Sequence, residues 1–169
     1  MQLVKPQLEH KQAALAYRQG HFDHNETEIQ GDNGFDKAES YEDWLANMDF
    51  IEAGKHVYLL PSSTYFAIVD GEIVGIVDIR HKLNDALLQT GGHIGYSVHP
   101  CKRRKGYATE ILRLALEKCK QMGITKALVT CYKDNIGSKK TILNNNGLLE
   151  NEYVDDNGNI ILRYWIDVC

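Results

Sequence analysis

The stretch from Val98 to Thr109 carries the strongest chemical pattern in this sequence of 169 residues. Four consecutive basic residues, Lys102 to Lys105, precede Gly106, and small residues follow where a helix is expected to begin. The first N–H groups of a helix have no partner within it, and the helix dipole makes that end positive. Small residues there let a phosphate approach the backbone. The pattern predicts an anion site suited to a pyrophosphate; a solvated basic turn before an ordinary helix is the alternative.

The elements that must hold this stretch follow from the spacing of apolar residues. Alternation and β-branched runs predict strands over residues 2–5, 64–69, 72–80, 93–98, 126–131, 148–155 and 160–168. Spacing of three and four residues predicts helices over residues 9–19, 40–54, 106–122 and 135–145. Asp70-Gly71 and residues 156–159 are typical of hairpin turns. The order predicts an α+β single domain over residues 1–169, with a mixed, mostly antiparallel sheet of about six to seven strands flanked by about four helices.

Composition narrows the class of protein. The formal net charge is −4, and 43% of the residues are hydrophobic. A general nucleic-acid or membrane-surface binder would carry a basic excess, so neither is expected. No apolar run approaches the ~20 residues that cross a bilayer, and the first residues lack the pattern of a signal peptide. The four cysteines form no CxxC pair and no zinc pattern, so we expect free thiols, no metal and a cytoplasmic location.

Two motifs and the order of elements carry a family resemblance. Arg103, Gly106 and Ala108 match the Q/R-x-x-G-x-G/A signature of the GNAT acetyltransferase superfamily, between the expected fourth strand and third helix. Residues 135–138 (NIGS) followed by Asn146-Gly147 resemble the family's N-x-x-S/A…G element. The order of elements is similar over essentially the whole chain, which implies a GNAT-like fold. Residues 91–98 (GGHIGYSV) also resemble a bacterial subgroup of these acetyltransferases.

The resemblance implies that acetyl-CoA is the cosubstrate. The backbone of the expected strand up to Val98 would pair with the pantetheine arm, and the N–H groups from Arg103 to Ala108 would hold the pyrophosphate. Asn135 would contact the arm and Ser138 would line its exit. The implied cofactor-binding residues are Tyr96, Ser97, Val98, Arg103, Arg104, Lys105, Gly106, Tyr107, Ala108, Thr109, Asn135 and Ser138.

The sequence departs from the family pattern at two positions. Arg104 stands where many members have Gly, a position that the strict signature leaves free. Ile142 stands where many members have a Tyr that protonates the leaving thiolate. That general acid is therefore missing, or another group such as Tyr132 or Ser138 supplies it.

An amine with a pKa near 10 must lose a proton before it attacks the thioester, so a base is needed. His93 begins the expected cofactor strand and has a suitable pKa; a structural His bonded to a neighbouring loop is the alternative. Asp78 interrupts an apolar strand; an ion pair with Arg80 on the same face is the alternative. Glu72 and His81 are further candidates.

These observations predict an N-acetyltransferase that acts on a primary amine of a small molecule or a protein. A non-catalytic acetyl-CoA-binding sensor stays open because of Ile142, and a nucleic-acid binder that uses Lys102–Lys105 is a third hypothesis. The acidic segment 20–38, with Glu26 and Glu28, is expected either to border the acceptor site or to form a solvated loop. A homodimer is expected by analogy with the family.

Overall fold

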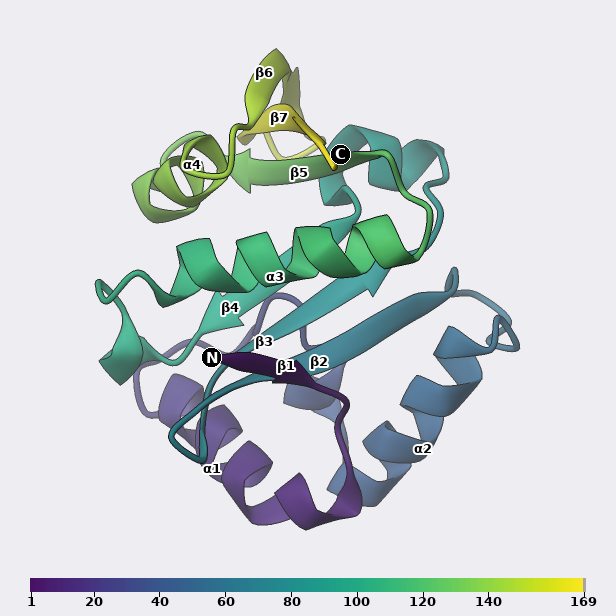
Figure 1. Cartoon of the computed structure of the whole chain (residues 1–169), viewed down its shortest axis with the longest axis vertical. Helices are drawn as coiled ribbons and strands as arrows, with labels where there is room; N and C mark the ends of the chain where they lie inside the picture. Colours follow the sequence, from purple (N-terminus) through teal and green to yellow (C-terminus); the bar gives the residue numbers. More distant parts are fainter. Residues whose placement is uncertain (169) are drawn as a thin grey trace.

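The computed structural model describes residues 1–168, which form two antiparallel sheets and four α-helices (Figure 1). The first sheet has the order β1-β2-β3-β4, with β1 (Gln2–Val4), β2 (Ser62–Val69), β3 (Glu72–Arg80) and β4 (Ile94–Val98). The second has the order β5-β7-β6, with β5 (Lys126–Tyr132), β6 (Leu148–Val154) and β7 (Ile160–Asp167). The helices are α1 (Lys11–Phe22), α2 (Tyr41–Glu52), α3 (Tyr107–Gln121) and α4 (Ile136–Leu143). The predicted α+β fold and its order of elements are confirmed.

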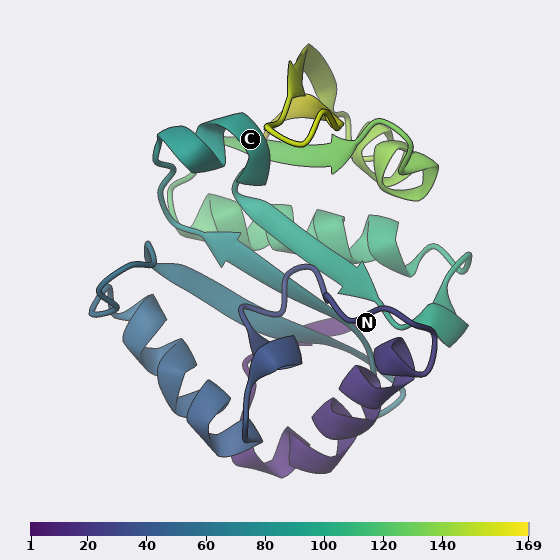
Figure 2. The same ribbon diagram turned by 180° about the vertical axis from the view of Figure 1, so that it is seen from behind.

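Helices cover both faces of the first sheet. Helices α1 and α2 lie on one face and α3 lies on the other (Figures 1 and 2). Successive residues of β3 point to opposite faces, so Ile76 joins the cluster under α1 and α2 while Val77 joins the cluster under α3. The face of α3 that the apolar spacing predicts is buried, with Ile111 and Cys119 fully inaccessible to solvent.

The sequence predicts one sheet, whereas the structure divides it between β4 and β5. The two strands approach each other near His93, whose N–H donates to the Leu128 carbonyl at 2.7 Å. The Leu128 N–H donates to the Nδ1 atom of the His93 ring at 2.9 Å. The His93 ring thus accepts the N–H that a backbone carbonyl would accept if β4 and β5 were paired as neighbouring strands. Figure 2 shows β4 and β5 diverging from this point, so the chain forms a V that opens toward the carboxyl ends of both strands.

Smaller differences lie in the loops. Helix α1 extends to Phe22, beyond the expected end at residue 19, and a 3₁₀ turn, Leu8–His10, precedes it. The expected loop 20–38 contains a second 3₁₀ turn, Phe35–Lys37, and residues 81–91 contain a π turn, Leu87–Gly91. Within residues 1–168, no helix is long and apolar enough to cross a membrane.

Candidate active site

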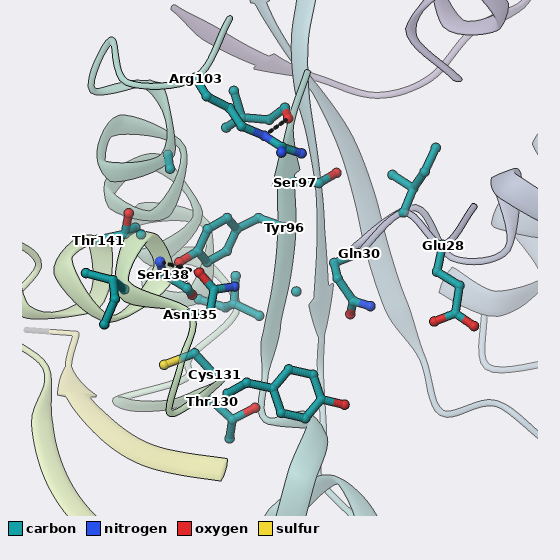
Figure 3. Close-up of a pocket in the computed structure, with 18 of the residues that line it drawn as sticks. Glu28, Gln30, Tyr96, Ser97, Arg103, Thr130, Cys131, Asn135, Ser138 and Thr141 are labelled. Atoms are coloured by element: carbon teal, nitrogen blue, oxygen red, sulfur yellow. Dashed lines mark hydrogen bonds between the residues drawn. The ribbon is translucent and has the colours of Figure 1, made fainter. Parts of the chain in front are cut away.

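A cavity of about 1160 Å³ fills the V between β4 and β5. One end is lined by the turn before α3, and the middle by β4 and the start of α4 (Figure 3). The π turn, the β6–β7 turn and the segment with Glu26, Glu28, Ile29 and Gln30 complete the lining. Sequence segments that lie far apart therefore meet around one elongated hollow.

The turn before α3 presents backbone N–H groups to the cavity. Gly106 precedes the helix with φ +79°, and a side chain added there would meet no atom within 4 Å. The first helical hydrogen bond runs from the Glu110 N–H to the Gly106 carbonyl, so the N–H groups of residues 107–109 have no partner within the helix. Arg104 has φ +62°, a conformation that Gly adopts without steric cost. This explains why Gly is common at that position in proteins with the same motif.

The Arg103 side chain is held by an acidic residue from a distant loop. Its two terminal nitrogens donate to the two carboxylate oxygens of Glu26, each at 2.6 Å, and its Nε atom donates to the Val98 carbonyl at 3.1 Å. The His21 ring lies 2.7 Å from the same carboxylate. These contacts hold the pKa of Glu26 below its usual range, chiefly through Arg103. Because Glu26 neutralises Arg103, and Glu72 pairs with Lys102, half of the basic run is already compensated.

The alternating side chains of β4 point to its two faces. The Tyr96 ring extends toward α4, where its hydroxyl lies 2.9 Å from the Ser138 hydroxyl (Figure 3). Ser97 points the other way and lies 2.9 Å from the hydroxyl of Tyr17 on α1. Burial raises the pKa of Tyr96 to about 12. Within the described residues β4 pairs only with β3, so its second edge faces the cavity.

The start of α4 closes the cavity opposite β4. The Asn135 side chain caps the helix by accepting the Ser138 N–H at 3.0 Å. Ile142 is fully buried and points away from the cavity, into the core. Tyr132 lines the cavity and is half exposed. No group of three His, Cys, Asp or Glu side chains suited to a metal ion exists among residues 1–168.

Comparison with known proteins identifies the family. The model of the acetyltransferase (GNAT) domain matches residues 3–147. The chain belongs to the GNAT acetyltransferase family. This confirms the resemblance that the two sequence motifs carry. No curated protein sequence matches significantly.

Solved structures of the same fold include proteins bound to acetyl-CoA or to CoA-disulfide. RimJ of Mycobacterium smegmatis, in complex with CoA-disulfide, superposes with a TM-score of 0.71 at 20% identity, over 98% of this chain and 80% of that chain. The microcin C7 self-immunity acetyltransferase MccE, in complex with acetyl-CoA and AMP, gives 0.68 at 18%, over 98% and 91%. An acetyltransferase of Salmonella typhimurium that modifies the N-terminal serine of ribosomal protein L7/L12 gives 0.67 at 15%, over 98% and 93%. At these identities the likeness establishes the fold.

Most of the implied cofactor-binding residues of this GNAT chain meet at the cavity. Lys105 is exposed and lies outside the lining. Of the expected catalytic residues, Ser138 and Tyr132 line the cavity, whereas His93 and Asp78 do not. The implied residues that line it are Tyr96, Ser97, Val98, Arg103, Arg104, Gly106, Tyr107, Ala108, Thr109, Asn135 and Ser138.

His93 is buried between the two sheets. Its Nδ1 atom accepts the Leu128 N–H, and its ring lies edge-on to Trp165, with centroids 6.4 Å apart. Burial, together with the charge of Arg80, lowers the pKa of His93 to about 4. The bond to the Leu128 N–H is the kind of contact expected of a structural His. Its partner lies on strand β5, whereas the sequence hypothesis placed it on a neighbouring loop.

Asp78 is also buried and bonded within the first sheet. Its carboxylate accepts the Thr64 hydroxyl at 3.0 Å, and the Arg80 Nε atom lies 3.8 Å away. Burial raises the pKa of this carboxyl, and Arg80 opposes the shift. Glu72 and His81 lie outside the cavity lining as well.

Part of the segment 20–38 lines the cavity, through Glu26, Glu28, Ile29 and Gln30, and its expected place beside an acceptor site stays a prediction. Glu28 and Gln30 are exposed and line the cavity, while Ile29 between them is buried in the core under α1 and α2. Gly31 fixes this segment, because a Cβ atom there would lie 2.2 Å from the Gly95 carbonyl oxygen. The sequence analysis missed this close contact between the backbones at Gly31 and Gly95. The two glycines lie far apart in the sequence, so no local sequence pattern indicates the contact.

Proposed function

We propose that this chain is an acetyl-CoA-dependent N-acetyltransferase that transfers the acetyl group directly to a primary amine. The observation that carries the proposal is the backbone cradle at the start of α3. Gly106 leaves open space beside N–H groups that have no helical partner, at the basic end of a cavity of about 1160 Å³. The residues therefore fit a pyrophosphate-bearing donor.

In this proposal the donor lies along β4. The N–H groups of residues 104–109 hold the pyrophosphate, and Arg104, which lines the cavity and forms no ion pair within residues 1–168, adds a positive charge beside it. The unpaired edge of β4, from Tyr96 to Val98, bonds the pantetheine arm as an added strand would. Asn135 and Ser138 at the start of α4 border the arm from the opposite side. When bound, acetyl-CoA supplies an acetyl group activated as a thioester.

The acceptor amine enters from the side of Glu28 and Gln30. Within residues 1–168, Glu28 forms no ion pair, whereas Arg103 already neutralises its neighbour Glu26. A free carboxylate on the cavity wall attracts a protonated amine and accepts one of its protons before the neutral amine attacks. We assign this base to Glu28, while His93 bonds the two sheets to each other and Asp78 is bonded within the first sheet.

The acceptor itself is a small-molecule or protein amine. One structural relative modifies the N-terminal serine of a ribosomal protein, so short peptides with a free N-terminus belong in the set of amines to be tested. Release of free thiol from acetyl-CoA is followed for each amine. Thiol release above the rate of hydrolysis without amine is expected for at least one of them. If every amine fails although acetyl-CoA binds, the chain is a non-catalytic sensor.

A pair of variants tests the base. Glu28→Gln is expected to lower kcat/KM for the amine by about 10²-fold or more and to leave acetyl-CoA affinity unchanged, because the lost group removes a proton and does not touch the donor. Glu39→Gln is the matched control, since Glu39 is exposed and lies outside the cavity lining. Equal kcat/KM values for the two variants would show that Glu28 is not the base.

A further inference from the structure

The reaction proposed above leaves one charge without an assigned partner. As the amine lone pair forms the C–N bond, the C–S bond breaks and its electron pair stays on sulfur as a thiolate. Glu28 takes one proton from the ammonium before attack, the second nitrogen proton passes to solvent as the amide forms, and water protonates the thiolate after release. A hydrogen-bond donor aimed at the sulfur would lower the barrier, because charge develops there in the transition state.

Ile142 cannot serve as this donor, since it has no polar atom and is fully buried. We propose that Tyr96 donates its hydroxyl hydrogen bond to the leaving sulfur, and that Ser138 positions the Tyr96 hydroxyl by donating to its oxygen. This inference rests on the proposed function, because it requires the donor to lie along β4.

The position of Tyr96 supports this role. It lies at the centre of β4, between the Arg103 end of the cavity and the Thr130 end, and Figure 3 shows its ring reaching from the strand to α4. The Ser138 hydroxyl lies 2.9 Å from the Tyr96 hydroxyl. Two other hydroxyls of the cavity are less suited: Thr130 donates to the Thr90 carbonyl at 2.7 Å, and Tyr132 is half exposed.

The pKa of Tyr96 determines whether its hydroxyl only donates a hydrogen bond to the sulfur or also transfers its proton. Burial raises its pKa to about 12, so the phenol stays protonated throughout the range in which enzymes work. A free thiol has a pKa of about 8.5, so the phenol is the weaker acid and keeps its proton. Tyr96 therefore stabilises the thiolate by a charge-assisted hydrogen bond and does not transfer the proton completely.

A second tyrosine–serine pair provides a matched control. The Tyr17 hydroxyl lies 2.9 Å from the Ser97 hydroxyl, the same separation as in the Tyr96 pair, but on the opposite face of β4. Tyr17 does not line the cavity. Tyr17→Phe and Tyr96→Phe each remove one partly buried phenol–serine bond, and of the two tyrosines only Tyr96 lines the cavity.

The test measures binding of the free product, so it needs no acceptor. Calorimetry compares CoA with desulfo-CoA, which lacks the sulfur, at pH 9, where part of the CoA thiol is ionised. The wild-type protein is expected to bind CoA about tenfold more tightly than desulfo-CoA, the size of one charge-assisted hydrogen bond. Tyr96→Phe is expected to abolish this preference, and Tyr17→Phe to keep it. Cys131 on β5 is the titratable neighbour of Tyr96, so the series is repeated with Cys131→Ala.

The outcomes separate the two proposals. If the wild-type protein binds neither ligand, the proposed donor site is wrong. If it binds both equally, or if Tyr96→Phe keeps the preference for CoA, the donor site stands and the role of Tyr96 is overturned. If Tyr96→Phe fails to fold, Ser138→Ala replaces it, because this variant leaves the aromatic ring in place. Ser138→Ala is then expected to reduce the ratio of the CoA affinity to the desulfo-CoA affinity. An unchanged ratio would overturn the inference.

Discussion

Replacing Gly106 by Asp tests where the donor's pyrophosphate binds. Gly106 has φ +79°, and an added side chain would meet no atom within 4 Å. The substitution therefore destabilises the folded state only by the cost of a left-handed backbone conformation at a residue with a side chain, about 1 kcal/mol. Gly106→Asp should remain folded, which urea denaturation can verify, while it places a carboxylate in the space that the phosphates are proposed to occupy.

The expected loss of affinity follows from Coulomb's law. Two like charges about 4 Å apart repel by about 4 kcal/mol at the effective dielectric constant of 20 that suits a protein surface. At 1.4 kcal/mol for each factor of ten, this lowers the affinity for acetyl-CoA by about 10³-fold. Isothermal calorimetry measures it directly. Gly106→Asn is the control, because it has nearly the same shape and the same backbone cost without the charge, and it should lose about tenfold or less.

The comparison of the two variants refutes or supports the reasoning. A folded Gly106→Asp protein that binds acetyl-CoA as tightly as the wild type would show that the pyrophosphate lies elsewhere. Equal losses in the Asp and Asn variants would show that the added side chain acts by its volume, so the electrostatic argument would fail while the position would stand.

Two further predictions concern stability. Gly31→Ala should lower the free energy of unfolding by about 3 kcal/mol, because the new Cβ would lie 2.2 Å from the Gly95 carbonyl; Gly34→Ala, with φ +87° and no atom within 4 Å, should cost only about 1 kcal/mol in the same urea titration. The pKa of His93 is about 4 in the folded protein against 6.5 when unfolded, so the unfolded state binds more protons between these values. Stability should fall by up to about 3 kcal/mol as the pH drops from 6.5 to 4, and His93→Gln should remove this part of the pH dependence. An unchanged pH dependence in that variant would assign the effect to another group.

The elements of this fold were predictable because each is specified by local sequence. The apolar spacing along residues 108–122 identifies α3 and its buried face, and Asp70-Gly71 supplies the positive φ values of 50° and 80° that the hairpin turn between β2 and β3 requires. The turn proposed to hold the pyrophosphate was predictable for the same reason. Its basic residues, Gly106 and the start of a helix are consecutive in the sequence.

The division of the sheet and the acceptor side were not predictable in the same way. The ring of His93 ends the hydrogen bonding between β4 and β5 by accepting the Leu128 N–H. A His at the start of a strand does not indicate that its partner lies 35 residues later in the sequence. The ion pair of Glu26 with Arg103 joins residues 77 positions apart. Such contacts depend on how the sheets, once formed, bring distant loops together, and a single sequence does not encode them locally.

The two faces of β4 give the proposed reaction its geometry. Successive residues of a strand point to opposite sides, so the face that carries Gly95 and Ser97 meets the loop with Glu28, while Tyr96 faces α4. Figure 3 shows Glu28 and Tyr96 on opposite sides of the strand. A thioester held along the unpaired edge of β4 would then have its attacking amine on one side and its leaving sulfur on the other. The amine's proton and the sulfur's charge are thus handled by different elements, and a change in the acceptor loop can alter the choice of amine without disturbing the group that stabilises the thiolate.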